Sequence, residues 1–181
     1  MDDEVTARWI AEALERFEVP LLRFAARLLR DDERAKDIVQ ETFLSLCQQR
    51  RTDVEAHLAA WLFRVCRNRA IDLRRKETRV EMVASDAAPE LAHEAGPDPS
   101  AIAQQREDAG QVMKILETLP ESQQEAVYLR FQGGLSYQEI AEITGHSVTH
   151  VGVLLHTAVK KIRAHLAELS RPAARAAEGS R

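Results

Sequence analysis

Gly133-Gly134-Leu135-Ser136-Tyr137-Gln138-Glu139-Ile140-Ala141 joins a helix stop to a helix start. The glycine pair suits the end of one helix. Ser136, with Glu139 three residues later, has the spacing of a capping box, and Leu135 and Ile140 are placed to form the hydrophobic staple that accompanies it. The stretch therefore predicts a well-defined helix that starts at Ser136.

The residues that follow complete a helix-turn-helix. The short helix is expected to end at Gly145, and Ser147 suits the N-cap of a last helix. The small Ala141 allows the two helices to approach closely. The inward face of the last helix is predicted to consist of Val148, Val151, Leu155, Ala158, Val159, Ile162 and Leu166. We interpret the motif as DNA-binding rather than as an ordinary corner between two helices, because capping, turn and spacing all agree.

Helical periodicity extends through most of the remaining chain. Of the 181 residues, aromatic residues make up 5%, and there are 7 Gly and 6 Pro, a composition that favours helices. Before the motif, one helix is predicted to carry Ile102, Ala109, Val112, Met113 and Leu116. Pro120 is expected to open the next helix, whose inward residues are Ala126, Val127 and Phe131.

Four helices are predicted in the N-terminal part. The first carries Trp9, Ile10, Ala13, Leu14 and Phe17, and Pro20 is expected to start the second, with Phe24, Ala25, Leu28 and Leu29 inward. Asp31 or Asp32 caps the third, and a polar connection at 49–55 precedes the fourth. The inward residues of these last two helices are predicted to be Ala35, Ile38, Val39, Thr42 and Leu46, and then Leu58, Trp61, Leu62, Val65, Cys66 and Leu73.

Charge is segregated along the chain. The formal net charge is −4, which alone argues against nucleic-acid binding by the whole molecule. The fourth helix nevertheless collects one set of side chains on a single arc, which we call the basic arc: Arg64, Arg67, Asn68, Arg74 and Arg75. Solvated helix faces usually mix both signs, and this one has almost no acid. Phosphate binding is therefore the favoured interpretation.

An acidic segment with Pro89, Pro97 and Pro99 divides the chain and is typical of a linker. We expect an N-terminal domain at 1–83, an acidic flexible linker at 84–100, a C-terminal domain at 101–169 and a disordered tail at 170–181. The predicted fold class is all-α, with two small helical domains.

The cysteines and the N-terminus predict neither a cofactor nor a membrane role. Cys47 and Cys66 lie in apolar-periodic segments without metal-ligand spacing, so we expect both to be buried structural thiols. No apolar run reaches membrane-spanning length, and the start of the chain is acidic where a signal peptide would be basic. We expect a cytoplasmic protein without a metal ion or cofactor.

Several strings resemble the sigma-70 family of RNA polymerase sigma factors, in its extracytoplasmic-function group. The string from Ala35 to Leu44 (AKDIVQETFL) is similar to the polymerase-binding helix of sigma region 2. The string from Trp61 to Asp72 (WLFRVCRNRAID) is similar to its promoter-opening helix. Leu119-Pro120-Glu121, Tyr128-Leu129-Arg130 and the helix-turn-helix are similar to region 4. The resemblance implies an alternative sigma factor, not an enzyme, that binds core RNA polymerase and promoter DNA in transcription initiation.

The resemblance also assigns roles to individual residues. It implies polymerase binding by Asp37, Gln40, Glu41 and Leu44. In region 2, Asn68 would help to capture a flipped-out promoter base, with 49–57 as the loop that pockets it, and Arg64, Arg67, Arg74 and Arg75 would contact phosphates. Region 4 would contact DNA through Ser136, Tyr137, Ser147, Thr149, His150, Val153, His156, Thr157, Lys160 and Lys161. An anti-sigma factor is a further partner that the sequence leaves open.

The last helix departs from the family pattern. Recognition helices of this group carry several Arg, Lys or Ser residues on the outer face, whereas this chain has His150, Gly152, Val153, Leu154, His156 and Thr157. We therefore expect weak, A·T-tolerant recognition of the minus-thirty-five element. Gly152 suggests a close approach to another group. Val153 and Leu154 either contact a protein partner or extend the domain core.

Two other classes of function remain as alternatives at this point. One is a helix-turn-helix regulator that binds an operator without polymerase, which the basic arc in the N-terminal domain argues against. The other is a metalloenzyme built on His146, His150 and His156, of which the first two have i,i+4 spacing. No carboxylate pair or nucleophile motif accompanies these histidines, so DNA-facing or surface histidines are the favoured interpretation.

Overall fold

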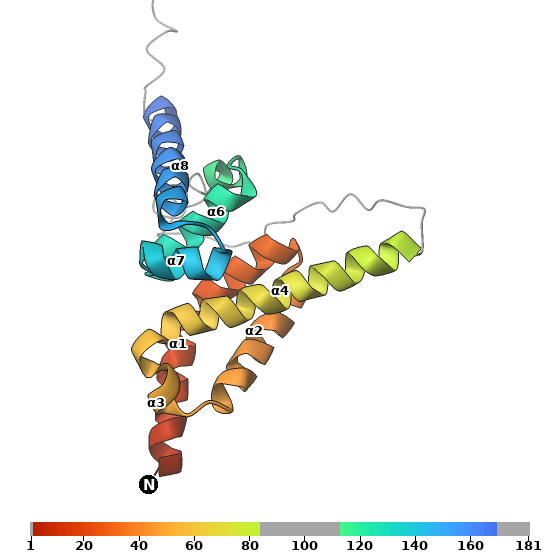
Figure 1. The fold of residues 1–181 in the computed structure, drawn as a ribbon, viewed down its shortest axis with the longest axis vertical. Helices are drawn as coiled ribbons and strands as arrows, with labels where there is room; N and C mark the ends of the chain where they lie inside the picture. Colours follow the sequence, from red (N-terminus) through yellow and green to blue (C-terminus); the bar gives the residue numbers. More distant parts are fainter. Residues whose placement is uncertain (1, 84–112, 170–181) are drawn as a thin grey trace, which may run out of the picture.

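The computed structural model describes residues 2–83 and 113–169, and all of the regular structure in these ranges is helical. Figure 1 shows helices from both halves of the chain packed together around the middle of the molecule. The predicted all-α fold is thus confirmed. The predicted linker and tail, and the predicted inward residues Ile102, Ala109 and Val112, lie outside the described residues.

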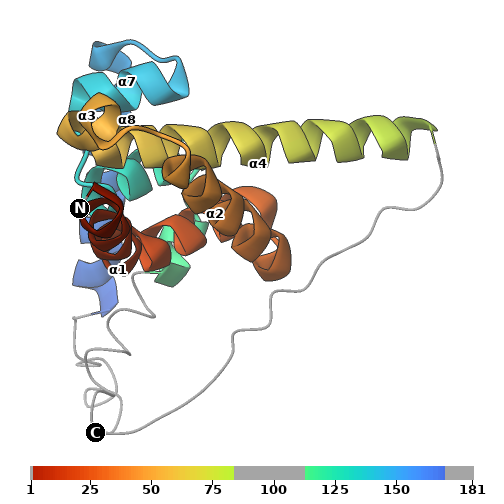
Figure 2. The ribbon, with the colours of Figure 1, turned by 90° about the horizontal axis from the view of Figure 1, so that it is seen from below.

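The N-terminal helices form a bundle around one long helix. Asp31, one of the two predicted caps, begins α2 by accepting a hydrogen bond from the Arg34 backbone N–H at 3.0 Å. Helix α4 extends beyond the other helices at its C-terminal end (Figure 2). The bounds are α1 Asp2–Leu29, α2 Asp32–Cys47, α3 Arg51–Val54, a 3-10 turn at Glu55–His57, and α4 Leu58–Val83.

The prediction of two helices separated at Pro20 was wrong. A single helix, α1, runs through Pro20, although proline cannot donate the backbone hydrogen bond of an interior position. Phe17, Leu21 and Phe24 are buried on both sides of the proline along one face. Tertiary packing of this face outweighs the local cost of the proline.

The C-terminal helices include the predicted helix-turn-helix. Residues 113–117 are helical, followed by α6 Glu121–Val127, a π-helical turn at Tyr128–Gln132, α7 Tyr137–Thr144 and α8 Val148–Leu169. Ser136 and Glu139 form the predicted capping box. Gly145 closes α7 in the left-handed conformation with φ 75°, which favours glycine. The predicted start and end of α7 are both confirmed.

The π-helical turn changes which residues face inward just before the helix-turn-helix. The Gly133 backbone N–H donates to the Tyr128 carbonyl at 3.1 Å, five residues back instead of four. The wider turn rotates Phe131 outward, and its side chain is 65% exposed. The prediction that Phe131 is buried was therefore wrong.

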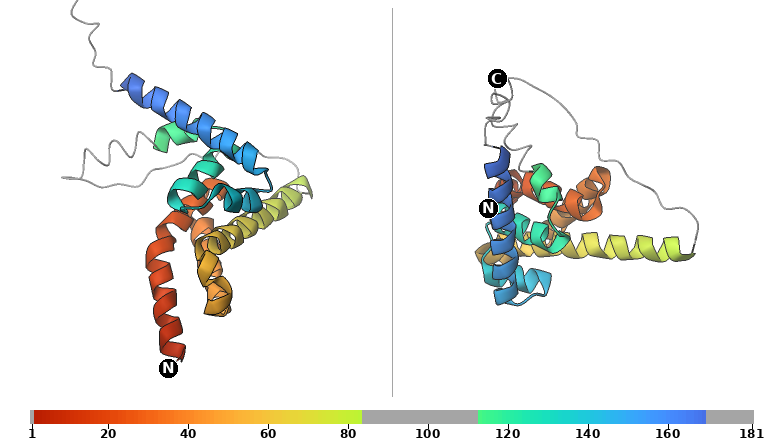
Figure 3. Two further views of the ribbon diagram at one scale, coloured as in Figure 1. Left: turned by 60° about the vertical axis from the view of Figure 1, so that its left-hand side comes forward. Right: turned by 90° about the horizontal axis from the view of Figure 1, so that it is seen from above.

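The two sets of helices pack against each other. Helix α4 contacts α7, and buried residues of both sets belong to one continuous apolar cluster. At the centre of the N-terminal part, the rings of Phe24 and Phe63 meet edge to face with centroids 5.3 Å apart. The left view in Figure 3 shows α8 (blue) projecting away from the N-terminal helices, while α4 extends in another direction.

Candidate nucleic-acid interface

One strip of α2 is accessible to a partner. Asp37, Gln40, Glu41 and Leu44 are all exposed and follow one another at helical spacing. Leu44 is 55% exposed, so its apolar side chain is accessible to a partner. Glu41 forms an ion pair with Arg69 of α4, so its carboxylate already has a partner. Next to the strip, a groove between α1 and α2 is lined by Ile10, Leu14, Leu22, Val39 and Phe43.

The basic arc on α4 is exposed except at one position. Arg64, Asn68 and Arg75 are exposed, and so is Arg74, which makes a long contact to the Leu28 carbonyl at 3.5 Å. Arg67 differs, because its Nε donates to Glu125 of α6 at 2.8 Å and its side chain is 19% exposed. The structure thus brings an acidic residue of the C-terminal helices, which the sequence analysis did not single out, onto the basic arc.

The helix-turn-helix presents a polar but weakly charged outer face. Thr149, His150, Val153 and His156 of α8 are exposed, Thr157 is half-buried, and Lys160 and Lys161 are exposed one turn further on. The Ser147 hydroxyl caps α8 by accepting from the His150 N–H at 3.1 Å. Ser136 is engaged in the capping box. Tyr137 is exposed, with the Arg130 guanidinium 5.5 Å from its ring centroid.

The apolar residues of α8 differ in their exposure. Leu154 is buried and belongs to the core, whereas Val153 is 56% exposed. Val148, predicted to face inward, is exposed as well. Val153 and Val148 are thus available to a partner, and Leu154 is not.

The close approach expected at Gly152 is not found within the described residues. A Cβ at this position would meet only a Tyr137 ring carbon, at 3.8 Å, which is ordinary van der Waals contact. We therefore expect Gly152→Ala to stabilise the protein by about 0.5–1 kcal/mol, because alanine loses less backbone entropy in a helix. Thermal unfolding followed by circular dichroism measures the effect.

Gly133→Ala is the matched control. Its Cβ would lie 2.7 Å from the Leu129 carbonyl oxygen and 3.0 Å from the Phe63 ring, so this change should destabilise the protein. A lower melting temperature for Gly152→Ala would contradict the ordinary contact distance found at this position. Unimpaired folding with weaker promoter binding would instead show that Gly152 approaches DNA.

The two cysteines differ in environment. Cys66 is buried in α4, and burial raises the pKa of its thiol to about 12, an effect that the neighbouring Thr42 hydroxyl partly offsets. Cys47 is exposed at the end of α2. The prediction of two buried thiols is therefore confirmed for Cys66 and wrong for Cys47, because the last turn of α2 points this residue outward.

No metal site forms within residues 2–83 and 113–169. The rings of His146 and His150 meet edge to face at 4.9 Å, but no third His, Cys, Asp or Glu joins them to make a metal-binding group there. In the same ranges, no helix combines the length and the apolar character needed to cross a membrane.

Comparison with known proteins identifies the family. Residues 13–80 match sigma-70 region 2, and residues 109–162 match sigma-70 region 4. The RNA polymerase sigma factor CarQ of Myxococcus xanthus is 31% identical over 153 residues, covering 84% of this chain and 86% of that protein. The ECF sigma factor SigL of Mycobacterium tuberculosis is 32% identical over 151 residues, covering 82% of this chain and 84% of SigL.

Solved structures agree with the sequence relatives. The sigma factor RpoE of Bartonella quintana, crystallised with the anti-sigma factor NepR, superposes with a TM-score of 0.64 at 25% identity, covering 89% of this chain and 98% of RpoE. CnrH, bound to the cytosolic domain of CnrY, has the same fold, with a TM-score of 0.56 at 23% identity, covering 90% of each chain. The chain therefore belongs to the extracytoplasmic-function group of sigma-70 factors, and it is an alternative sigma factor that binds core RNA polymerase and promoter DNA to start transcription.

Proposed function

We propose that three surfaces of this chain divide the work of initiation: the α2 strip docks on core polymerase, the basic arc holds the opened promoter, and the helix-turn-helix contacts upstream DNA. One observation carries the proposal. Asp37, Gln40 and Leu44 are exposed on α2, whereas Ile38 and Val39 between them are buried in the core. These three side chains are therefore not needed for the core of the protein, whereas Glu41 is held by Arg69.

The α2 strip combines one apolar residue, Leu44, with polar neighbours, and protein interfaces likewise combine apolar and polar groups. Leu44 provides apolar area, and Asp37 and Gln40 provide directional hydrogen bonds. Glu41 contributes less directly, because its carboxylate is held by Arg69. Its role is to fix the position of α4 against α2 at the edge of the docking surface.

Different residues of the basic arc hold the DNA strand in position and recognise its bases. Arg64, Arg74 and Arg75 supply cations for phosphates, which fix register but carry no sequence information. Asn68 supplies an amide with donors and acceptors for the edge of an unpaired base. We assign the pocket for this base to the helical segment at Arg51–Val54 and the following turn at Glu55–His57.

In region 4, the helix-turn-helix binds duplex DNA weakly and tolerates A·T-rich sequences. Ser136 and Ser147 fix the two helix starts, while Tyr137, Thr149, His150, His156 and Thr157 offer hydrogen bonds and Val153 offers contact to thymine methyl groups. Lys160 and Lys161 contact phosphates.

Three further properties belong to this proposal. The chain acts in the cytoplasm, where polymerase and promoters are found. It contributes binding and strand capture and carries out no reaction of its own. RpoE, which has the same fold, is bound to the anti-sigma factor NepR. We extend this to an anti-sigma factor that holds the present chain inactive.

The test of the proposal is the combined variant Asp37→Ala, Gln40→Ala and Leu44→Ala. We expect binding to core polymerase to weaken by at least about tenfold, since even one lost interface anchor costs upward of 1 kcal/mol. Transcription from a cognate promoter should fall in parallel. Affinity for core is measured by fluorescence anisotropy of the labelled full chain.

The control is Glu12→Ala with Glu15→Ala, two exposed acidic residues of α1 outside the α2 strip. This control should bind core as the parent does. Unchanged core binding by the triple variant, with helix content preserved, would refute the docking assignment. Tight promoter binding by the parent chain without polymerase would favour an independent regulator instead.

A further inference from the structure

The outer face of α8 carries histidines at positions where arginine or lysine would provide a permanent positive charge. His150 and His156 are exposed on this face, on either side of the exposed Val153. From Val148 to Val159 the sequence contains no Asp, Glu, Lys or Arg. The charge of this part of the face therefore depends on whether its histidines are protonated.

Two contacts hold His150 at the start of α8. Its backbone N–H donates to the Ser147 hydroxyl at 3.1 Å, and its ring meets the ring of the half-buried His146 edge to face, with centroids 4.9 Å apart. Like charges at this distance repel, so the two rings accommodate one proton more easily than two. The His150 ring is thus fixed on one side by His146 and remains exposed to solvent.

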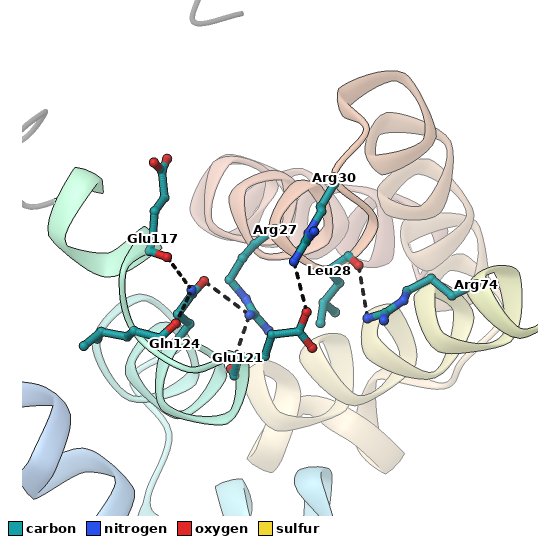
Figure 4. Close-up of polar contacts among 8 residues, drawn as sticks. Arg27, Leu28, Arg30, Arg74, Glu117, Glu121 and Gln124 are labelled. Carbon is teal, nitrogen blue, oxygen red and sulfur yellow. Dashed lines mark hydrogen bonds and ion pairs between the residues drawn. The ribbon is translucent and has the colours of Figure 1, made fainter. Parts of the chain in front are cut away.

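Helix α6 packs on α8, but its acidic side chains are paired with cations of the N-terminal helices. Figure 4 shows Glu121 next to Arg30 of α1, whose Nη2 donates to the carboxylate at 3.3 Å. Glu125 accepts from the Arg67 Nε of α4 at 2.8 Å. Neither carboxylate therefore neutralises a histidine of α8.

Helix α7 also packs on α8, and its acidic groups accept hydrogen bonds from within the motif. Glu139 is held in the capping box, and Glu142 accepts from the Gln138 amide at 3.4 Å. The remaining titratable group of α7 is Tyr137, whose ring faces the Arg130 guanidinium. No histidine forms an ion pair among the described residues, so a proton gained on this face of α8 adds a charge that is available to DNA.

We propose that His150 and His156 are proton-dependent cations of region 4, which strengthen its binding to upstream promoter DNA when they are protonated. This inference rests on the proposed function, because it takes the outer face of α8 as the surface turned to DNA. Imidazole gains its proton as the pH falls from about 8 to about 5, and nearby phosphates favour the charged form. The affinity for DNA should therefore be highest at the acidic end of this range and should fall as the pH rises.

Three variants test the two histidines. The double variant His150→Gln, His156→Gln replaces both rings by neutral amides that still form hydrogen bonds. His150→Arg places a permanent charge at the start of α8. The matched control is His165→Gln, because it makes the same change at an exposed histidine of α8 beyond Lys161.

Binding is measured with the complete holoenzyme, because the chain starts transcription together with core polymerase. The probe is a fluorescent duplex from a cognate promoter that ends upstream of the minus-ten element, so base capture by region 2 does not contribute. Fluorescence anisotropy gives the affinity at about pH 6 and about pH 8, within and above the range in which imidazole is protonated, and at several salt concentrations. Comparison with the parent at each pH cancels the effects of pH on core polymerase. Circular dichroism at both pH values checks that each variant keeps its helix content.

We expect the parent to bind about three- to tenfold more tightly at the lower pH, with a salt dependence steeper by about one for each cation gained. The double variant should lose most of this gain, since neither amide can be protonated. His150→Arg should bind more tightly than the parent at the higher pH. His165→Gln should keep the gain of the parent.

The proposal would be overturned by a pH-dependent gain that persists in the double variant, by an equal loss in His165→Gln, or by His150→Arg binding no more tightly than the parent at the higher pH. Lys160→Ala with Lys161→Ala separates this inference from the proposed function. If the lysine variant weakens binding at both pH values while the double histidine variant follows the parent, the DNA role of α8 stands and only the proton dependence fails. If neither variant affects binding, the assignment of α8 to DNA fails as well.

Discussion

Phe24→Ala should lower the free energy of unfolding of the N-terminal helices by about 3–5 kcal/mol, the usual cost of removing a buried phenylalanine. Phe24 of α1 is fully buried and packs edge to face against Phe63 of α4, at a centroid distance of 5.3 Å. Its removal takes away both the buried apolar area and this aromatic contact, and it leaves a cavity between two helices. Small domains have only about 5–15 kcal/mol of stability in total, so the variant should be close to unfolding.

Tryptophan fluorescence measures this effect selectively, because both tryptophans, Trp9 and Trp61, lie in the N-terminal helices. Urea unfolding followed by this signal gives the free energy of unfolding. Val19→Ala is the matched control, since Val19 is half-exposed on the same helix and its loss should change stability by less than about 0.5 kcal/mol. A cost below about 1 kcal/mol for Phe24→Ala would mean that α1 and α4 do not pack as described.

Features that depend on neighbours in sequence were predictable. The capping box of Ser136 and Glu139, the left-handed Gly145 and the Asp31 cap each involve residues no more than four positions apart, and all are present. Most of the predicted buried faces are also present, because a helix repeats its orientation every 3.6 residues. The family-specific strings then assigned order and function to these helices.

Features that depend on packing or register were not predictable. Pro20 suggested a helix start, but buried residues on both sides carry α1 through it. Phe131 and Cys47 had helical spacing from buried residues, yet a π-helical turn and a helix end expose them. Val148, in the first turn of α8, was also predicted to face inward and is exposed. A local change in helix geometry is therefore enough to expose a residue that the sequence pattern predicts to be buried.

In the candidate site, too, local features were predictable from the sequence and contacts between distant residues were not. Exposure of the α2 strip and of most of the basic arc agrees with the helical periodicity of the sequence. The pairing of Arg67 with Glu125 joins residues 58 positions apart. No local signal marks Glu125 as its partner, because an acidic residue on an amphipathic helix is ordinarily solvated. Only the docked arrangement of the two sets of helices reveals it.

Val153→Arg should convert weak recognition of the minus-thirty-five element into selective recognition. The outer face of α8 has Thr149, His150, Val153 and His156 exposed and no Arg or Lys before Lys160, so the parent lacks a bidentate contact to guanine. An arginine at the centre of this face adds such a contact. The expected gain is about 1–3 kcal/mol in favour of guanine at one position.

Binding of randomised upstream sequences by the polymerase holoenzyme measures this selectivity. The parent should recover a diffuse, A·T-tolerant set, and Val153→Arg should enrich guanine at one position. Val153→Lys is the control, because a point charge strengthens phosphate contact but lacks the planar fork that reads guanine, so it should raise affinity with little base preference. A tight, G-rich consensus from the parent would contradict the prediction, since it would require a guanine contact from histidine or threonine that equals that of arginine.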